Sequence, residues 1–238
     1  EICNRHGAYV AFHCGSTKNG SNLNGLMDTF DFAGNNHLHI CHVNAYCRGL
    51  THGSPVVEMA TALKELGARR QFISESHMAP YNCAWARLEN NMPRSHVTRT
   101  CLKMGGFDPD RRGLMAAASS GYMLVLKPTV QRVIYLKGDE AANYLKSVEY
   151  DAMVSFPVNV RSSAFLAATE KDGDGSFIVT ALSTDGGGIP RNFLLSHGLS
   201  LVRFDALTLS EFILKSCRKP AIMLGLHQKG HLGVGADA

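Results

Sequence analysis

Residues 37–77 read HLHICHVNAYCRGLTHGSPVVEMATALKELGARRQFISESH and combine the two periodicities of an α/β fold. Residues 37–43 form a short run of apolar and β-compatible residues, which predicts a strand. A helix is predicted over 55–67, because Ser54 is a good N-cap, proline stands at the first helical position and apolar residues recur at helical spacing. Residues 71–74 predict the next strand. A strand, a helix and a strand in this order indicate two parallel strands joined by a right-handed crossover.

The same alternation continues on both sides of this segment. Residues 9–12 predict an earlier strand, residues 23–32 predict the helix after it, and residues 177–182 form the most hydrophobic predicted strand. Thr208 and Glu211 have the spacing of a capping box and predict the start of a late helix. Together these elements predict an α/β fold with a parallel sheet, which either closes into a barrel or remains an open doubly wound sheet.

Between residues 79 and 150 the periodicity is interrupted by several turn-forming segments. A stretch of this length between two core strands is more often a substrate-shaping insertion than a linker. The sequence therefore predicts a helical insertion, with helices over 96–104, 111–119 and 139–148.

Composition narrows the class of protein and of partner. With 45% hydrophobic and 18% charged residues, the 238-residue chain is typical of a folded domain and unlike a disordered, collagen-like or coiled-coil protein. Its net charge of +4 includes no polybasic cluster, so we expect a small-molecule partner and no nucleic acid. No apolar run reaches the ~20 residues of a membrane span, so no membrane partner is expected. The 7 cysteines include no C-x-x-C pair, which predicts reduced thiols and a cytoplasmic location.

Three residues that can bind a metal follow predicted strands. They are His13, His42 and Asp185. Because the carboxyl ends of parallel strands meet at one edge of a sheet, we expect these side chains to lie together there. Since side chains alternate along a strand, Leu38 and Ile40 are expected to share the face of His42. Imidazole and carboxylate are ligands of a borderline divalent cation, and zinc is the expected metal.

Four other polar residues are candidates for substrate binding. Arg48, Glu75 and His77 also follow predicted strand ends, where loops line the site of such folds. Arg191 lies just after Asp185 and has the guanidinium geometry that pairs with a substrate carboxylate.

The order of these motifs resembles the second half of the amidohydrolase superfamily. Within that superfamily the chain is most similar to N-acyl-D-amino-acid deacylases, hydantoinases and dihydroorotases. The resemblance covers most of the chain, is poor over the insertion and is most specific in the tail. The motifs that carry it are the strand before His13, HICHVN at 39–44, TDGGGIPRN at 184–192, CRKPAIMLGL at 217–226 and KGHLGVGADA at 229–238.

This resemblance implies a partial (β/α) barrel, strands five to eight, over residues 1–228 with an insertion at about 79–150. Residues 229–238 would begin a truncated β-sandwich. It also implies that His13, His42 and Asp185 bind the metal and that Asp185 transfers the proton. The implied activity is metal-dependent hydrolysis of a C–N amide bond, in an N-acyl-D-amino acid or a cyclic amide, by a homo-oligomeric parent. Since the chain starts at Glu1 and reaches a strand almost at once, we expect it to begin inside a larger protein and to be inactive alone.

Two features of the sequence depart from the family pattern. No His-x-His motif precedes Tyr9; His37-Leu38-His39 fits the motif but belongs to the strand of His42, and we expect it to be structural. Gly186 follows Asp185 where cyclic-amide hydrolases usually have histidine, which favours the deacylase branch. Two alternatives stay open: a non-catalytic hydantoinase-like scaffold, and an open-sheet binding protein without metal if His42 and Asp185 lie far apart.

Overall fold

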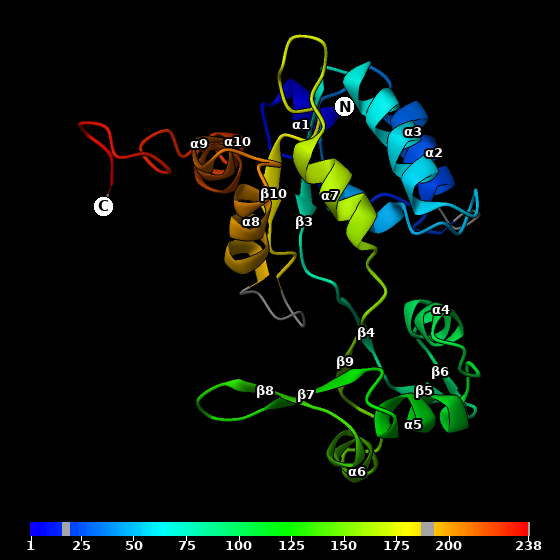
Figure 1. Cartoon of the computed structure of the whole chain (residues 1–238). Coiled ribbons are helices and arrows are strands. Elements are labelled where there is room, and N and C mark those ends of the chain that lie inside the picture. The colour runs from blue at the N-terminus through cyan, green and yellow to red at the C-terminus, as the bar shows by residue number, and fades with distance from the viewer. Residues whose placement is uncertain (16–19, 187–192, 238) are drawn as a thin grey trace. The chain divides into compact units, whose positions relative to one another are not determined.

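The computed structural model describes residues 1–15, 20–186 and 193–237 (Figure 1). The described residues form two compact units. The first unit contains Glu1–Met78, Val160–Asp185 and the chain from residue 193 onward, and the second contains Ala79–Asn159. A short N-terminal helix, α1 (Ile2–Arg5), belongs to the first unit.

The first unit is built on a sheet of four parallel strands. In space the strands follow the order β1 (Ala11–Phe12), β2 (Leu38–Ile40), β3 (Phe72–His77) and β10 (Ala181–Ser183). Each neighbouring pair is parallel, with Phe12 beside Ile40, Ile40 beside Ser74, and Ser76 beside Leu182. The predicted α/β fold with a parallel sheet is confirmed.

Helices connect these strands. They are α2 (Leu23–Ala33), the short 3-10 helix η1 (Val43–Tyr46), α3 (Pro55–Gly67) and α7 (Arg161–Thr169). Helices α2 and α3 lie where the sequence predicts them, whereas η1 and α7 are not among the predicted elements. The hydroxyl of Ser54 accepts a hydrogen bond from the Val57 amide, so the predicted N-cap of α3 is confirmed. One face of the sheet packs on the helices in a single apolar core that includes Leu26, Phe30, Ile40, Met59, Leu63 and Phe72.

The last strand starts later than predicted. The predicted strand over 177–182 is wrong for its first residues, because β10 begins only at Ala181. The preceding residues pair backward with the end of α7: the amide of Ile178 donates to the Glu170 carbonyl, and Phe177 bridges to Lys171. The Asp172 carboxylate accepts hydrogen bonds from two amides of the intervening turn. These bonds hold the backbone of the turn away from the sheet.

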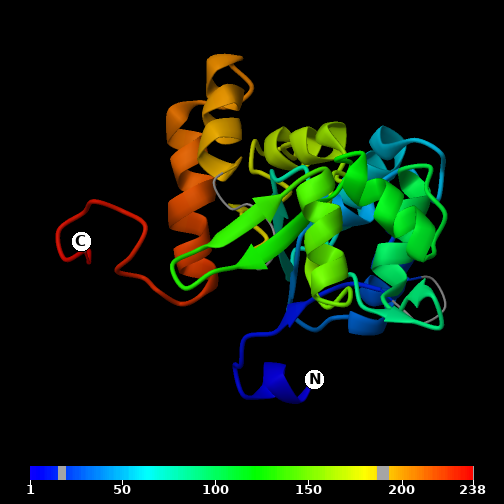
Figure 2. The same ribbon diagram turned by 90° about the horizontal axis from the view of Figure 1, so that it is seen from below.

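The C-terminal part of the first unit is helical. It contains α8 (Phe193–Arg203), α9 (Leu209–Ile213), the π-helix η2 (Leu214–Arg218) and α10 (Lys219–Met223). The capping box of Thr208 and Glu211 is confirmed, whereas α8 is not among the predicted elements. Helices α8 and α9 lie side by side (Figure 2). Residues 229–237, where a strand was expected to begin, form turns.

The second unit contains strands as well as helices, whereas the sequence predicts a helical insertion. Its predicted helices exist as α4 (His96–Met104), α5 (Arg111–Ser119) and α6 (Asp139–Ser147). They accompany an antiparallel sheet in the order β4 (Asn82–Trp85), β9 (Met153–Phe156), β7 (Leu124–Pro128) and β8 (Val133–Leu136), and a small hairpin of β5 (Leu88–Glu89) and β6 (Met92–Pro93). The strands are short and pair across long loops, as Asn82 does with Phe156, so local periodicity does not reveal them.

No helix within the described ranges has both the length and the apolar composition that crossing a membrane requires.

Candidate functional site

The carboxyl edge of the parallel sheet gathers polar side chains from all four strands. His13 follows β1, His42 follows β2, His77 ends β3 and Asp185 follows β10. Nδ1 of His13 lies 3.0 Å from Nε2 of His42, and Nε2 of His77 lies 3.5 Å from Oδ2 of Asp185. The rings of His42 and His77 are 6.5 Å apart between centroids. The side chains chosen from the sequence therefore lie along one edge, as two close pairs.

His42 reaches this edge by a route that strand alternation does not predict. The residues before it belong to the core: Ile40 is fully buried in the helix-covered core, and Leu38 packs against that core. His42 itself has a left-handed backbone with φ 34°, and the chain turns there into η1. The period of two ends with the strand, so it cannot be extended to a residue in this conformation.

Asp185 also leaves its strand in the left-handed region, with φ 44°. Its carboxylate is half-buried and faces the fully buried His77. Left-handed backbone is uncommon outside glycine, but aspartate and asparagine adopt it more readily than most residues. The sharp turn therefore directs the Asp185 carboxylate toward the end of β3.

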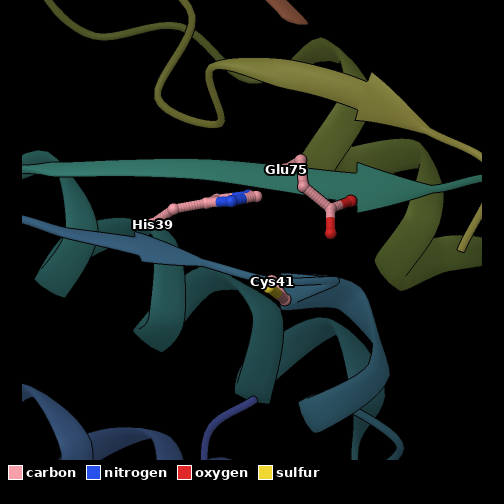
Figure 3. Close-up of side chains that lie close together, drawn as sticks. All are labelled: His39, Cys41 and Glu75. Atoms are coloured by element: carbon pink, nitrogen blue, oxygen red, sulfur yellow. The ribbon is translucent and has the colours of Figure 1, made fainter. Parts of the chain in front are cut away.

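The opposite side of β2 from the core carries a second group of ligands. His39, Cys41 and Glu75 form the one set of three or more His, Cys, Asp or Glu residues, within the described part of the chain, whose ligand atoms all lie within 4.8 Å of one another (Figure 3). His13, His42 and Asp185 do not form such a compact set. The sequence predicts a structural role for His39, and Cys41 is not among the predicted site residues. His39 and Cys41 are two residues apart and alternate with the apolar Leu38 and Ile40. This alternation is the sequence signal that could have identified the pair.

Glu75 joins the two groups of side chains. It is only 8% exposed, and its Oε1 accepts a hydrogen bond of 2.7 Å from the amide of His42. The other carboxylate oxygen accepts a hydrogen bond from the hydroxyl of Ser183. The pKa of Glu75 is raised to about 7, mainly by burial; the hydrogen bonds from Ser183 and His42 oppose the shift, and the charge of Asp185 adds to it. Glu75 therefore ties β3 to β10 and to the turn after β2.

His13 and His42 both favour the neutral form. Burial lowers the pKa of His42 to about 3, and nearby His13 and Arg48 add to that effect. Loss of solvent also lowers the pKa of His13, although the charge of Asp185 partly opposes it. Neutral imidazole is the form that binds a metal ion. Half-buried Arg48 thus acts on this site through its positive charge.

Buried polar contacts fix the loops that carry these side chains. Nε2 of His13 lies 2.7 Å from the hydroxyl of Ser21, which donates to the carbonyl of Cys14. Asn44, fully buried in η1, donates to the His77 carbonyl, and its Oδ1 accepts hydrogen bonds from the Ser76 hydroxyl and the His77 amide. Asn44 is not among the predicted site residues, because nothing local in the sequence distinguishes it from an ordinary loop asparagine.

Cys41 is a half-buried thiol next to Glu75. Burial raises the pKa of its thiol to about 11, and the adjacent charges of Glu75 and Asp185 add to the shift. Glu75 and Cys41 therefore disfavour each other's ionised form. A cation bound between the carboxylate and the sulfur would reverse this effect.

Of the substrate-binding candidates, Glu75, His77 and Arg48 lie at or next to the carboxyl edge, and Arg191 lies outside the described residues. Comparison of the chain with protein-family models, with curated proteins and with solved structures finds no match.

Proposed function

We propose that the chain contributes to a metal-dependent hydrolase that cleaves a C–N amide bond at the carboxyl edge of its parallel sheet. His13 and His42 would bind a divalent cation, with Asp185 beside them. The observation that carries this proposal is the 3.0 Å approach of the His13 and His42 ring nitrogens, on consecutive strands and at the edge that also holds Asp185.

The donor set fits a zinc-type cation. Two imidazole nitrogens bound to a tetrahedral zinc at about 2.0–2.1 Å lie roughly 3.3 Å apart, close to the spacing of this pair. Both rings favour the neutral form, as metal binding requires. Asp185 lies near enough to raise the pKa of His13, so its charge reaches the position between the rings.

The protein groups can then be assigned to the hydrolysis. When bound, the cation would polarise the scissile carbonyl and lower the pKa of water toward ~7. Asp185 would accept a proton from the attacking water as its oxygen bonds to the carbonyl carbon. The same carboxyl would give that proton to the nitrogen as the C–N bond breaks. His77, 3.5 Å from Asp185, would orient the carboxylate for both transfers.

The strand order supports the barrel-related interpretation of the parallel sheet. In space β1, β2, β3 and β10 follow their order in the chain, all in one direction. An open doubly wound sheet reverses its strand order at a switch point, whereas successive barrel strands do not. The substrate class, an N-acyl-D-amino acid or a cyclic amide, is proposed from the sequence resemblance alone.

The test is hydrolysis of N-acyl-D-amino acids and of hydantoins by the longest form of the protein that contains this chain. We expect Asp185→Asn to abolish turnover and removal of the metal to do the same. The matched control is Asp205→Asn, because Asp205 is exposed and also has positive φ, so activity should persist. Full turnover by Asp185→Asn, or by protein shown to be metal-free, would reject the mechanism.

A further inference from the structure

His39, Cys41 and Glu75 come together through the register of two strands. Ile40 lies beside Ser74, so the next residue along each strand, Cys41 and Glu75, are also neighbours. His39 precedes Cys41 by two residues and therefore points to the same side of β2. Figure 3 shows the His39 ring extending toward the Glu75 side chain, with Cys41 just past the end of the strand that carries His39. The three ligand atoms lie within 4.8 Å of one another.

The two nitrogens of His39 differ in a way that points to a ligand. Nδ1 is hydrogen-bonded to the hydroxyl of Tyr9. Nε2 is buried and has no hydrogen-bond partner among the residues that the structure describes. A buried nitrogen without a partner is unfavourable and rare. Metal-binding histidines typically have this arrangement, with one nitrogen held by an outer hydrogen bond and the other directed at the cation.

Glu75 is oriented for the same role. One carboxylate oxygen accepts a hydrogen bond from the His42 amide, and the other accepts a hydrogen bond from the Ser183 hydroxyl. Each carboxylate oxygen can accept more than one bond, so these contacts position the group and leave capacity for a cation. Ligating carboxylates are commonly supported in this way.

His39 borders a cleft in the first unit. A cleft of about 540 Å³ is lined by Tyr9, His39 and Ile73 on the sheet side and by Leu224 near the end of α10. The outer hydrogen-bond partner of His39 therefore lines this cleft as well.

We propose that His39, Cys41 and Glu75 bind a second cation, separate from the one proposed at His13 and His42. One nitrogen, one sulfur and one oxygen form a donor set that suits zinc and related borderline cations, because calcium and magnesium prefer oxygen ligands. Three protein ligands leave a fourth position for water or for a substrate atom. This site goes beyond the proposed hydrolase function and does not depend on it.

Cobalt(II) tests the site, because a cobalt–thiolate bond absorbs in the near ultraviolet through charge transfer and reports the sulfur directly. We expect metal-free protein titrated with cobalt(II) to develop this absorption. Cys41→Ser should abolish this absorption. His39→Ala should weaken the affinity for cobalt by more than about 10-fold, because loss of a residue that only hydrogen-bonds to a metal ligand already weakens metal affinity by that factor. Cys83→Ser is the matched control, because Cys83 is equally half-buried but lies in the second unit, and it should retain the absorption.

Two further measurements separate this site from the hydrolase proposal. His13→Ala should leave the thiolate absorption unchanged at the same cobalt concentrations, whatever its effect on hydrolysis. Far-ultraviolet circular dichroism of the metal-free variants checks that each is folded, and His39→Ala, at a half-buried position, serves if Cys41→Ser does not fold. The proposal is overturned if wild-type protein lacks the absorption, if Cys41→Ser retains it, or if His13→Ala removes it.

Discussion

The imidazoles of His13 and His42 approach to 3.0 Å between Nδ1 and Nε2, although 29 positions separate them in the sequence. The rings meet edge to face, with centroids 4.6 Å apart. At this distance one nitrogen must donate a proton and the other must accept it, because two protonated rings would repel each other. The pair is thus a neutral unit in the protein, and a divalent cation between the rings would replace the shared proton.

Replacing His13 by alanine should weaken metal binding without unfolding the protein. His13 is exposed, so the free energy of unfolding should change by less than about 0.5 kcal/mol. Zinc affinity at the edge should fall by more than about 10-fold. Isothermal titration calorimetry of metal-free protein measures the affinity, with His6→Ala, an exposed histidine of the turn after α1, as the control. Equal affinities of the two variants would contradict the assignment.

Asn44→Ala should destabilise the first unit strongly. The buried amide makes three hydrogen bonds to the end of β3, and the substitution removes all of them. We expect a loss of about 2–3 kcal/mol in the free energy of unfolding, measured by urea denaturation. Asn35→Ala, at an exposed position, should change it by less than about 0.5 kcal/mol. A loss as small as that of the control would show that these contacts contribute little.

Lys215 should make the free energy of unfolding depend on pH in the alkaline range. It is fully buried, donates to the Ala168 carbonyl at 2.7 Å, and burial lowers its pKa from 10.5 to about 7. At a pH between these two pKa values, Lys215 binds a proton in the unfolded chain but not in the folded protein. The free energy of unfolding should therefore rise with pH from about 7 to 10.5 by up to ~1.4 kcal/mol per unit. Below pH 7 both states are protonated and this contribution is constant at its lowest value.

The variant Lys215→Met isolates this effect. Urea denaturation across the same pH range should show a flatter profile for Lys215→Met than for the wild type. Lys64→Met, which changes an exposed lysine of α3, should keep the wild-type slope. If the profiles of all three proteins coincide, Lys215 is protonated in the folded state as well.

Gly113→Ala should destabilise the second unit, although alanine favours helices. A Cβ at Gly113 would lie 1.9 Å from the carbonyl oxygen of Asp108, and backbone cannot move aside cheaply. We expect a loss of about 1–3 kcal/mol in thermal or urea unfolding. Gly67→Ala is the contrasting change, because a Cβ there would meet no described atom within 4 Å apart from the backbone of its own helix. It should be neutral or stabilising by up to ~1 kcal/mol. A neutral Gly113→Ala would show that the loop before α5 adjusts.

The sequence alone determined the elements whose signals are local. The Ser54 cap, the Thr208–Glu211 capping box and the helices of the insertion depend on hydrogen bonds and periodicity within a few residues, so they could be predicted. The sequence also placed His13, His42 and Asp185 after strands, and parallel pairing brings strand ends to one edge.

Only the tertiary structure decided which of these side chains come close together. The left-handed backbone of His42 sends its ring to His13, and the register of β2 and β3 sets Cys41 beside Glu75. The antiparallel strands of the second unit and the late start of β10 likewise depend on partners distant in the sequence. Such contacts form only when segments far apart along the chain pack together, and no window of a few residues contains both partners of the interaction.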